Sequence, residues 1–385
     1  MALMLYNSAS GKKEGFVTLK PGSVSLYVCG VTPYDTTHLG HAFTYVSFDV
    51  LIRYLKSMGF KVNYVQNVTD IDDDILRKAK EQKMGWKELG EFWTKRYLDD
   101  MKSINVLPPT HYVKATDSIQ QIIKIVSRLE KGAFAYKSGP NVYFNTKKFS
   151  GYGSLSHFNE AQMLMLLSER GGDINDSKKK NKLDFIVWQG WKEGEPYWDS
   201  PWGKGRPGWH IECSAMINEF LGDQIDIHGG GRDLIFPHHE SEIAQSESFT
   251  GKHPFSRFFM HTAMVMYLGE KMAKSLGNLV LVSQLLKNNS PNAIRWMLLS
   301  HHYRKVWEYE QADMDEAEEA IASINSYLAK PGAKQLNKVA LKNFAAAMDD
   351  DLNTPAALEV IAKLVQSKKD QETARKILDT LGFVL

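Results

Sequence analysis

The chain has 385 residues, of which 43% are hydrophobic and 11% aromatic, a composition that excludes disorder and supports two or three packed domains. The formal net charge of +2 at pH 7 permits contact with nucleotide or RNA phosphates but does not demand it. Two cysteines, Cys29 and Cys213, are too few for a disulfide framework. Because no apolar run could span a membrane and the first residues lack a signal-peptide core, we expect a cytoplasmic protein.

The first predicted elements form a strand, a tight polar turn and a helix. Residues 1–20 predict a short strand-and-turn lead-in, and the apolar run 24–28 predicts a strand. The sequence His38-Leu39-Gly40-His41 then opens an apolar-periodic helix that ends near Met58. Backbone N–H groups at such a helix start favour anions, and His38 and His41 can add donors to a phosphate. The residues alone also fit two histidines of the surface or of the core edge.

A second parallel strand is predicted over residues 61–66, and it runs into Thr69 and a series of aspartates. Ligand groups in α/β sheets lie just beyond the carboxyl ends of strands, which makes Thr69 a candidate site residue. The aspartates after it are more typical of an acidic helix start.

Residues from about 110 to 204 are expected to form an insertion into the nucleotide-binding fold. Helices are predicted over 87–104 and 118–131, with short strands around 142–145. The loop 171–182 is either plainly solvated or a basic patch that touches RNA, through Lys178, Lys179, Lys180 and Lys182. The Trp-, Pro- and Gly-rich segment 188–208 indicates an ordered connection without a helix.

After a helix that starts within residues 205–214, a buried strand is predicted over 225–228, followed by Gly229, Gly230 and Gly231. Three glycines after a strand let the backbone approach a flat ligand closely, and their spacing differs from that of a dinucleotide-binding loop. Beyond residue 310 the pattern predicts helices only, over 311–328, 339–349, 355–366 and 371–381. Thr354 is expected to be the N-cap of the third of these.

A metal site is predicted from the two cysteines and the sequence Pro237-His238-His239-Glu240-Ser241-Glu242. If Pro237 begins a helix, His238 and Glu242 lie one turn apart on one face and can hold one ion. Together with Cys29 and Cys213 they form a set whose thiolate and imidazole ligands suit Zn²⁺. On spacing alone His239 and Glu240 are rival ligands, and a purely structural role for these residues stays open.

Several blocks together resemble one family. His38-Leu39-Gly40-His41 and Lys271-Met272-Ala273-Lys274-Ser275 resemble the HIGH and KMSKS signatures of class I aminoacyl-tRNA synthetases. YVCGVTPYD, VQNVTDIDDDI, GRPGWHIECSAM and DIHGGGRDLIFPHHESEIAQSE resemble blocks of the cysteinyl-tRNA synthetase family. The resemblance implies an α/β, Rossmann-type catalytic domain over residues 1–310, interrupted by the insertion at about 110–204. A C-terminal helical bundle would follow over 311–385.

The resemblance also implies a reaction and its site. The expected activity joins L-cysteine to ATP, used with Mg²⁺, and passes the cysteinyl group to the acceptor end of tRNA(Cys). One Zn²⁺ would be held by Cys29, Cys213, His238 and Glu242, with Gly30, Thr69 and Trp209 around the substrate cysteine. The expected ATP-site and catalytic residues are His38, His41, Gly229, Gly230, Gly231, Asp233, Lys271 and Lys274.

Three departures from the family pattern keep alternatives open. Position 273 is Ala rather than Ser, Ala42-Phe43-Thr44 replaces an Arg-containing segment, and no anticodon-binding extension is expected after Leu385. The short form also resembles the mycothiol-pathway ligase, which transfers cysteine to the amine of the aminosugar glucosaminyl-inositol. A non-catalytic RNA-binding paralogue is a third alternative. We expect a monomer that does not bind membranes.

Overall fold

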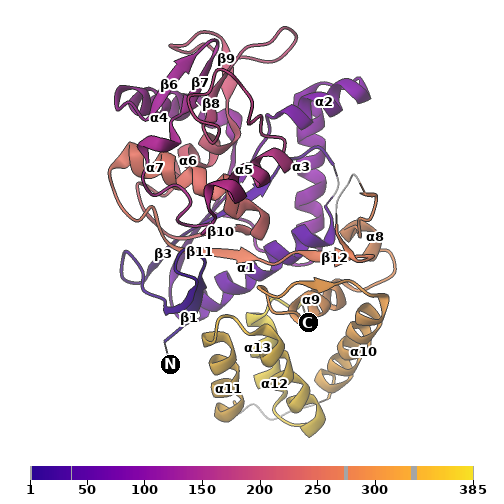
Figure 1. The fold of residues 1–385 in the computed structure, drawn as a ribbon. Coiled ribbons are helices and arrows are strands. Elements are labelled where there is room, and N and C mark those ends of the chain that lie inside the picture. The colour runs from indigo at the N-terminus through magenta and orange to yellow at the C-terminus, as the bar shows by residue number, and fades with distance from the viewer. Residues whose placement is uncertain (1, 36, 273–275, 331–335, 385) are drawn as a thin grey trace.

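The computed structural model describes residues 2–35, 37–272, 276–330 and 336–384. Its centre is a parallel sheet of five strands, shown with the rest of the fold in Figure 1. In spatial order the strands are β11 (Ser256–Thr262), β10 (Ile225–Gly231), β3 (Ser23–Val31), β4 (Lys61–Val68) and β5 (His111–Lys114). The predicted nucleotide-binding half, β3–α1–β4, is therefore confirmed, with α1 spanning Leu39–Ser57.

Side chains of the central strand β3 alternate between two covered faces of the sheet. Leu26 and Val28 pack into the core that α1 shares with the C-terminal helices. Tyr27 and Cys29 point to the opposite face and pack against α6 (Trp209–Phe220). This period of two, imposed by the extended backbone, places the first cysteine under the helix that carries the second.

The insertion is an antiparallel sheet with helices beside it. Its strands, in order, are β6 (Ala135–Ser138), β7 (Asn141–Phe144), β8 (Phe185–Gly190) and β9 (Gly205–Pro207). The adjoining helices are α4 (Ile119–Lys131) and α5 (Glu160–Glu169). Because β5 pairs in parallel with β4 over residues 111–114, the parallel sheet continues past residue 110, where we expected the insertion to begin.

The C-terminal helices match their predicted positions closely. They are α10 (Gln311–Leu328), α11 (Lys338–Asp349), α12 (Thr354–Ser367) and α13 (Gln371–Thr380). The N-cap of α12 is a correction, because Asn353 accepts the bond from the Ala356 amide at 3.2 Å and Thr354 is already helical. Their apolar faces join α1 and α9 (Pro291–Leu299) in one continuous core.

The remaining elements are short or lie at the edges. A hairpin, β1 (Met4–Asn7) with β2 (Lys12–Gly15), confirms the predicted lead-in. The other helices are α2 (Asp73–Gln82), α3 (Trp86–Ser103), α7 (Glu240–Thr250) and α8 (Val282–Leu285), and the other strands are β12 (Val265–Tyr267), β13 (Glu270–Lys271) and β14 (Trp307–Glu308). In the described part of the chain, every helix is too short or too polar to cross a bilayer.

Candidate functional site

The two cysteines meet between the sheet and α6. Cys29, near the carboxyl end of β3, and Cys213, in the second turn of α6, bring their Sγ atoms to 4.0 Å from each other. Both thiols are free and buried. Residues 184 positions apart therefore form one pair of thiols at the sheet edge where α/β proteins bind their ligands.

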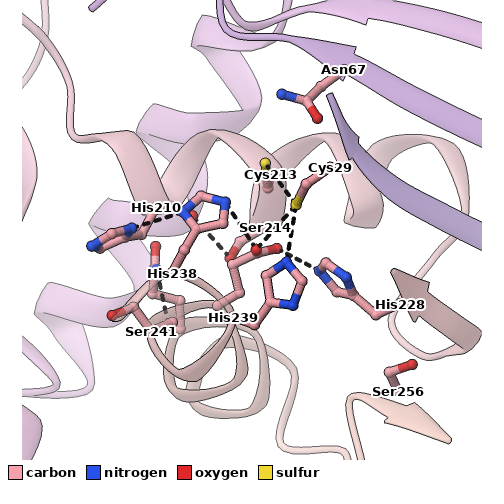
Figure 2. A network of polar contacts seen from close by, with 12 residues as sticks. Cys29, Asn67, His210, Cys213, Ser214, His228, His238, His239, Ser241 and Ser256 are labelled. Carbon is pink, nitrogen blue, oxygen red and sulfur yellow. Dashed lines mark hydrogen bonds and ion pairs between the residues drawn. The ribbon is translucent and has the colours of Figure 1, made fainter. Parts of the chain in front are cut away.

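His238 and Glu242 complete the predicted set. His238 lies in the helical turn Ile235–His239 that leads into α7, and Glu242 lies in the first turn of α7. His238 Nε2 is 3.1 Å from Glu242 Oε1, and Glu242 Oε1 lies 3.8 Å from Cys29 Sγ. The ligand atoms of Cys29, Cys213, His238 and Glu242 all lie within 4.8 Å of one another, and Figure 2 shows the cysteines and His238 around one point. The structure therefore gathers four residues from three distant segments into one buried cluster.

The electrostatics of this cluster are compatible with a bound cation. Burial raises the pKa values of the Cys29 thiol and the Glu242 carboxyl, and it lowers the pKa of His238 well below its usual value. A bound dication reverses the cost of the two anionic forms and uses neutral imidazole as a ligand. Two thiolates, one imidazole and one carboxylate are a donor set that fits Zn²⁺.

Further histidines surround the four residues (Figure 2). His210 Nδ1 lies 2.9 Å from His238 Nδ1, and His228 Nε2 lies 2.9 Å from Glu242 Oε2. The rival ligand His239 is in the pocket too, with Nε2 at 3.2 Å from Cys29 Sγ. The rival Glu240 is not, because its carboxylate accepts bonds from the backbone amides of the insertion.

Sequence reasoning assigned no role in the site to His210, His228 or His261. A signal for His228 was available, since it is a titratable residue in a strand that the sequence predicted to be buried. Its position in β10 is paired with Tyr27 of β3, so its side chain shares the face of Cys29.

The expected cysteine-pocket residues lie beside the cluster. Trp209 stacks on His238 with ring centroids 4.3 Å apart and remains 43% exposed. A Cβ at Gly30 would lie 1.7 Å from the Asn67 carbonyl oxygen, so only glycine fits there. Asn67 Oδ1 accepts the Gly30 amide at 2.7 Å and its Nδ2 donates to Thr69 Oγ1 at 3.2 Å. Thr69 is thus buried and oriented by a residue that the sequence did not single out.

The two motifs of the nucleotide site are joined by backbone pairing. His38 caps α1, because its Nδ1 accepts the Gly40 amide at 3.1 Å, and its ring stacks on that of His41 at 3.8 Å. The Leu39 amide donates to the Val280 carbonyl at 2.8 Å, which ties this helix start to the segment after residues 271–275. Lys271 is exposed in β13, whereas Ala273 and Lys274 lie outside the described residues.

The three glycines are a partial correction, because Gly229, Gly230 and Gly231 lie within β10 rather than after it. A Cβ at Gly229 would meet the Phe48 ring of α1 at 2.3 Å. At Gly231 a Cβ would meet Asp233 Oδ1 at 2.6 Å. The need for glycine at these two positions therefore comes at least partly from close packing of the chain itself.

Comparisons with known proteins show the family of the chain. The family model described as "tRNA synthetases class I (C) catalytic domain" matches residues 15–319, and the DALR domain model matches 343–384. The chain is 44% identical over 397 residues to the cysteine--tRNA ligase of Legionella pneumophila (strain Corby), covering 99% of this chain and 85% of that protein. It is 46% identical over 393 residues to the cysteine--tRNA ligase of Trichodesmium erythraeum, covering 95% of this chain and 79% of that protein. The chain belongs to the cysteine--tRNA ligase family of class I tRNA synthetases.

Solved structures of other class I synthetases share the fold of this cysteine--tRNA ligase family member. Mycobacterium tuberculosis methionyl-tRNA synthetase in complex with methionyl-adenylate has a TM-score of 0.62 at 16% identity, covering 94% of this chain and 82% of that one. The ternary complex of the Agrobacterium radiobacter K84 agnB2 LeuRS with tRNA and LeuAMS has a TM-score of 0.68 at 9% identity, covering 94% of this chain and 84% of that one. The expected fold class is confirmed.

Proposed function

We propose that this chain activates L-cysteine with ATP, forming cysteinyl-adenylate and pyrophosphate, and transfers the cysteinyl group to tRNA(Cys). The observation that carries the proposal is the placement of two kinds of site on one strand–loop–helix unit. Cys29 lies near the end of β3, in a cluster suited to a thiol, and His38 caps the helix that follows. Cysteine has a thiol for the first site and a carboxylate that attacks ATP at the second.

The buried cluster of metal-ligating side chains would select cysteine over other amino acids. Cys29, Cys213, His238 and Glu242 would hold one Zn²⁺, which when bound supplies a ligand position that favours a thiolate over the hydroxyl of serine. Trp209, stacked on His238 and half-exposed, covers one side of this position. Gly30 and Thr69, linked through Asn67, line another side.

The start of α1 and the segments beside it would carry out the activation of cysteine by ATP. The positive end of the α1 helix dipole, with His38 and His41 beside it, favours the phosphates of Mg²⁺-bound ATP. The cysteine carboxylate attacks the α-phosphate and pyrophosphate leaves, so donors aimed at the departing charge lower the barrier. We assign Lys271 and Lys274 to that charge from the sequence resemblance, and Gly230, Gly231 and Asp233 to the neighbourhood of the adenosine.

The acceptor, domain and location assignments extend the proposal. The exposed Lys178, Lys180 and Lys182 of the insertion are suited to tRNA phosphates, whereas Lys179 is partly buried and donates to the Asp173 carbonyl. We propose a catalytic domain up to about residue 310, a helical domain after it, and a monomeric chain. Two thiolate ligands require a reducing setting, which supports a cytoplasmic location.

The test combines exchange and acceptor assays on the purified chain. We expect ATP–pyrophosphate exchange that requires cysteine and is not supported by serine, followed by charging of tRNA(Cys). Metal analysis of the same protein should find one zinc ion per chain. Exchange without charging of tRNA, together with ligation of cysteine to glucosaminyl-inositol, would instead assign the aminosugar as acceptor. A chain that binds tRNA but supports no exchange would be the non-catalytic paralogue.

A further inference from the structure

A second set of four metal-ligating side chains overlaps the first. Cys29, His228, His239 and Glu242 also bring their ligand atoms within 4.8 Å of one another, and all four are buried. We propose that the pocket offers one metal ion two overlapping positions, and that the ion moves to the second when a ligand unique to the first is lost. This inference rests on the metal binding contained in the proposed function.

The geometry of the second set is centred on the shared ligands. His239 Nε2 lies 3.2 Å from Cys29 Sγ, and its ring centroid is 5.7 Å from that of His238, the preceding residue in the helical turn before α7. His228 Nε2 lies 2.9 Å from Glu242 Oε2, while Oε1 of the same carboxylate faces His238 at 3.1 Å. Glu242 thus presents one oxygen to each position, and Cys29 lies between them.

The His239 ring is held in place by its own support. Its Nδ1 lies 2.9 Å from His261 Nε2, and His261 Nδ1 lies 2.8 Å from Ser8 Oγ. Metal-binding histidines almost always use their second nitrogen for such an orienting bond. His239 therefore has the support expected of a ligand even though the first set does not include it.

Three features make the first position the stronger. It offers two thiolates where the second offers one, and soft thiolates dominate Zn²⁺ binding. His238 is backed by His210 at 2.9 Å, whereas His228 Nδ1 is buried without a hydrogen-bond partner in the described part of the chain. Because Cys29 and Glu242 serve both positions, a four-coordinate ion at one removes ligands that the other needs. The intact pocket is therefore expected to hold its ion at the first position.

Movement of the metal ion to the second position would separate it from the proposed cysteine pocket. The first position adjoins Trp209, which stacks on His238 and reaches solvent, so a substrate thiol can approach it. The second position adjoins His228, whose ring is packed against Phe255 and Phe259. An ion there stays bound in an apolar setting but leaves the proposed cysteine pocket, so metal content alone would not report a competent site.

Cobalt substitution of the full chain tests the proposal, because sulfur-to-cobalt charge-transfer absorption scales with the number of bound thiolates. His238→Ala keeps both cysteines, so an ion left at the first position would show the intensity of the unmodified protein. We expect His238→Ala to retain one Co²⁺ with about half that intensity, because only Cys29 contributes a thiolate at the second position. Cys213→Ala should give the same reduced spectrum.

Matched variants separate the outcomes. His239→Ala alone should leave the two-thiolate spectrum unchanged, whereas His238→Ala combined with His239→Ala should release the metal, as Cys29→Ala should. Full charge-transfer intensity in His238→Ala, or complete metal loss from it, would overturn the two-position proposal while leaving the metal site of the proposed function intact. An unmodified protein that binds no metal would overturn the proposed zinc role itself.

Discussion

Two groups of buried charged side chains lie on opposite faces of the parallel sheet, and they differ in how completely they are paired. On the α1 side, Asp49 accepts bonds from Arg53 Nε at 2.9 Å, from the Leu107 amide at 2.9 Å and from Arg295. Arg295, 1% exposed, also donates to carbonyls of the chain, among them Leu381 at 2.6 Å and Ile104 at 3.0 Å. Both charges are compensated from within the protein, which indicates a structural role. We call the group of Asp49, Arg53 and Arg295 the structural junction.

On the α6 side, the same degree of burial comes with thiol, imidazole and carboxylate groups that face one another. Glu242 lies 2.9 Å from His228 Nε2 and 3.1 Å from His238 Nε2, and burial lowers the pKa of His238. The Nδ1 atoms of His210 and His238 face each other. Burial alone therefore does not mark a functional site, whereas a buried group of thiol, imidazole and carboxylate ligand atoms gathered around one point does.

The largest effect is expected from breaking the junction. Asp49→Asn leaves the buried Arg295 guanidinium without its counter-charge, and such a loss costs about 3–5 kcal/mol of unfolding free energy. Urea denaturation measures it. The matched control is Asp49→Asn combined with Arg295→Met, which removes both charges and should be less destabilised than Asp49→Asn alone. A loss below about 1 kcal/mol in the single variant would show that the junction is not structural.

The next effect concerns the nucleotide site. His41→Ala should lower cysteine-dependent ATP–pyrophosphate exchange by about 10²–10³-fold, because one preorganised donor at the developing charge is lost. Metal content and unfolding free energy should stay the same. His111, exposed in β5, offers the control, since His111→Ala should leave exchange unchanged. Equal exchange in both variants would remove His41 from the proposed mechanism.

A smaller effect, on metal affinity, is expected from a residue that contacts a proposed metal ligand without being a ligand itself. His210→Ala removes the ring that lies against His238 Nδ1 but none of the four proposed ligands. Loss of such a supporting partner typically weakens metal affinity by about 10–100-fold. Competition with a chromogenic chelator measures the affinity. Unchanged affinity would show that His238 does not depend on His210 for its orientation.

The sequence was sufficient for the elements that local patterns specify. Apolar periodicity predicted α1 and the four C-terminal helices, and the resemblance brought together Cys29, Cys213, His238 and Glu242, which the structure gathers in one cluster. The predictions were wrong at the ends of two elements, where one residue or a few residues determine the boundary. Asn353 rather than Thr354 caps α12, and the three glycines continue β10 because they pair with residues 260–262 of β11.

The histidines around the cluster could not be predicted because they depend on tertiary pairing. His261 comes from β11, and its role depends on facing His239 at the start of α7, which no spacing along the chain encodes. The pairing of Leu39 with Val280 likewise joins segments more than two hundred residues apart. Local pattern fixes where a helix or strand lies, whereas the partners across the sheet edge follow only from the assembled fold.

The smallest effect should come from a pair whose contacts resemble those of the junction but whose burial does not. Arg77 bonds Asp74 at 2.8 Å and Glu81 at 2.9 Å on α2, so it contacts two groups of opposite charge, as Asp49 contacts Arg53 and Arg295. These side chains are about half exposed, so water replaces the lost contacts and screens the charges. Arg77→Ala is expected to leave the unfolding free energy almost unchanged, measured by the same urea denaturation. If it matched the loss in Asp49→Asn, contact number rather than burial would determine the cost, and the contrast between the two faces of the sheet would lose its physical basis.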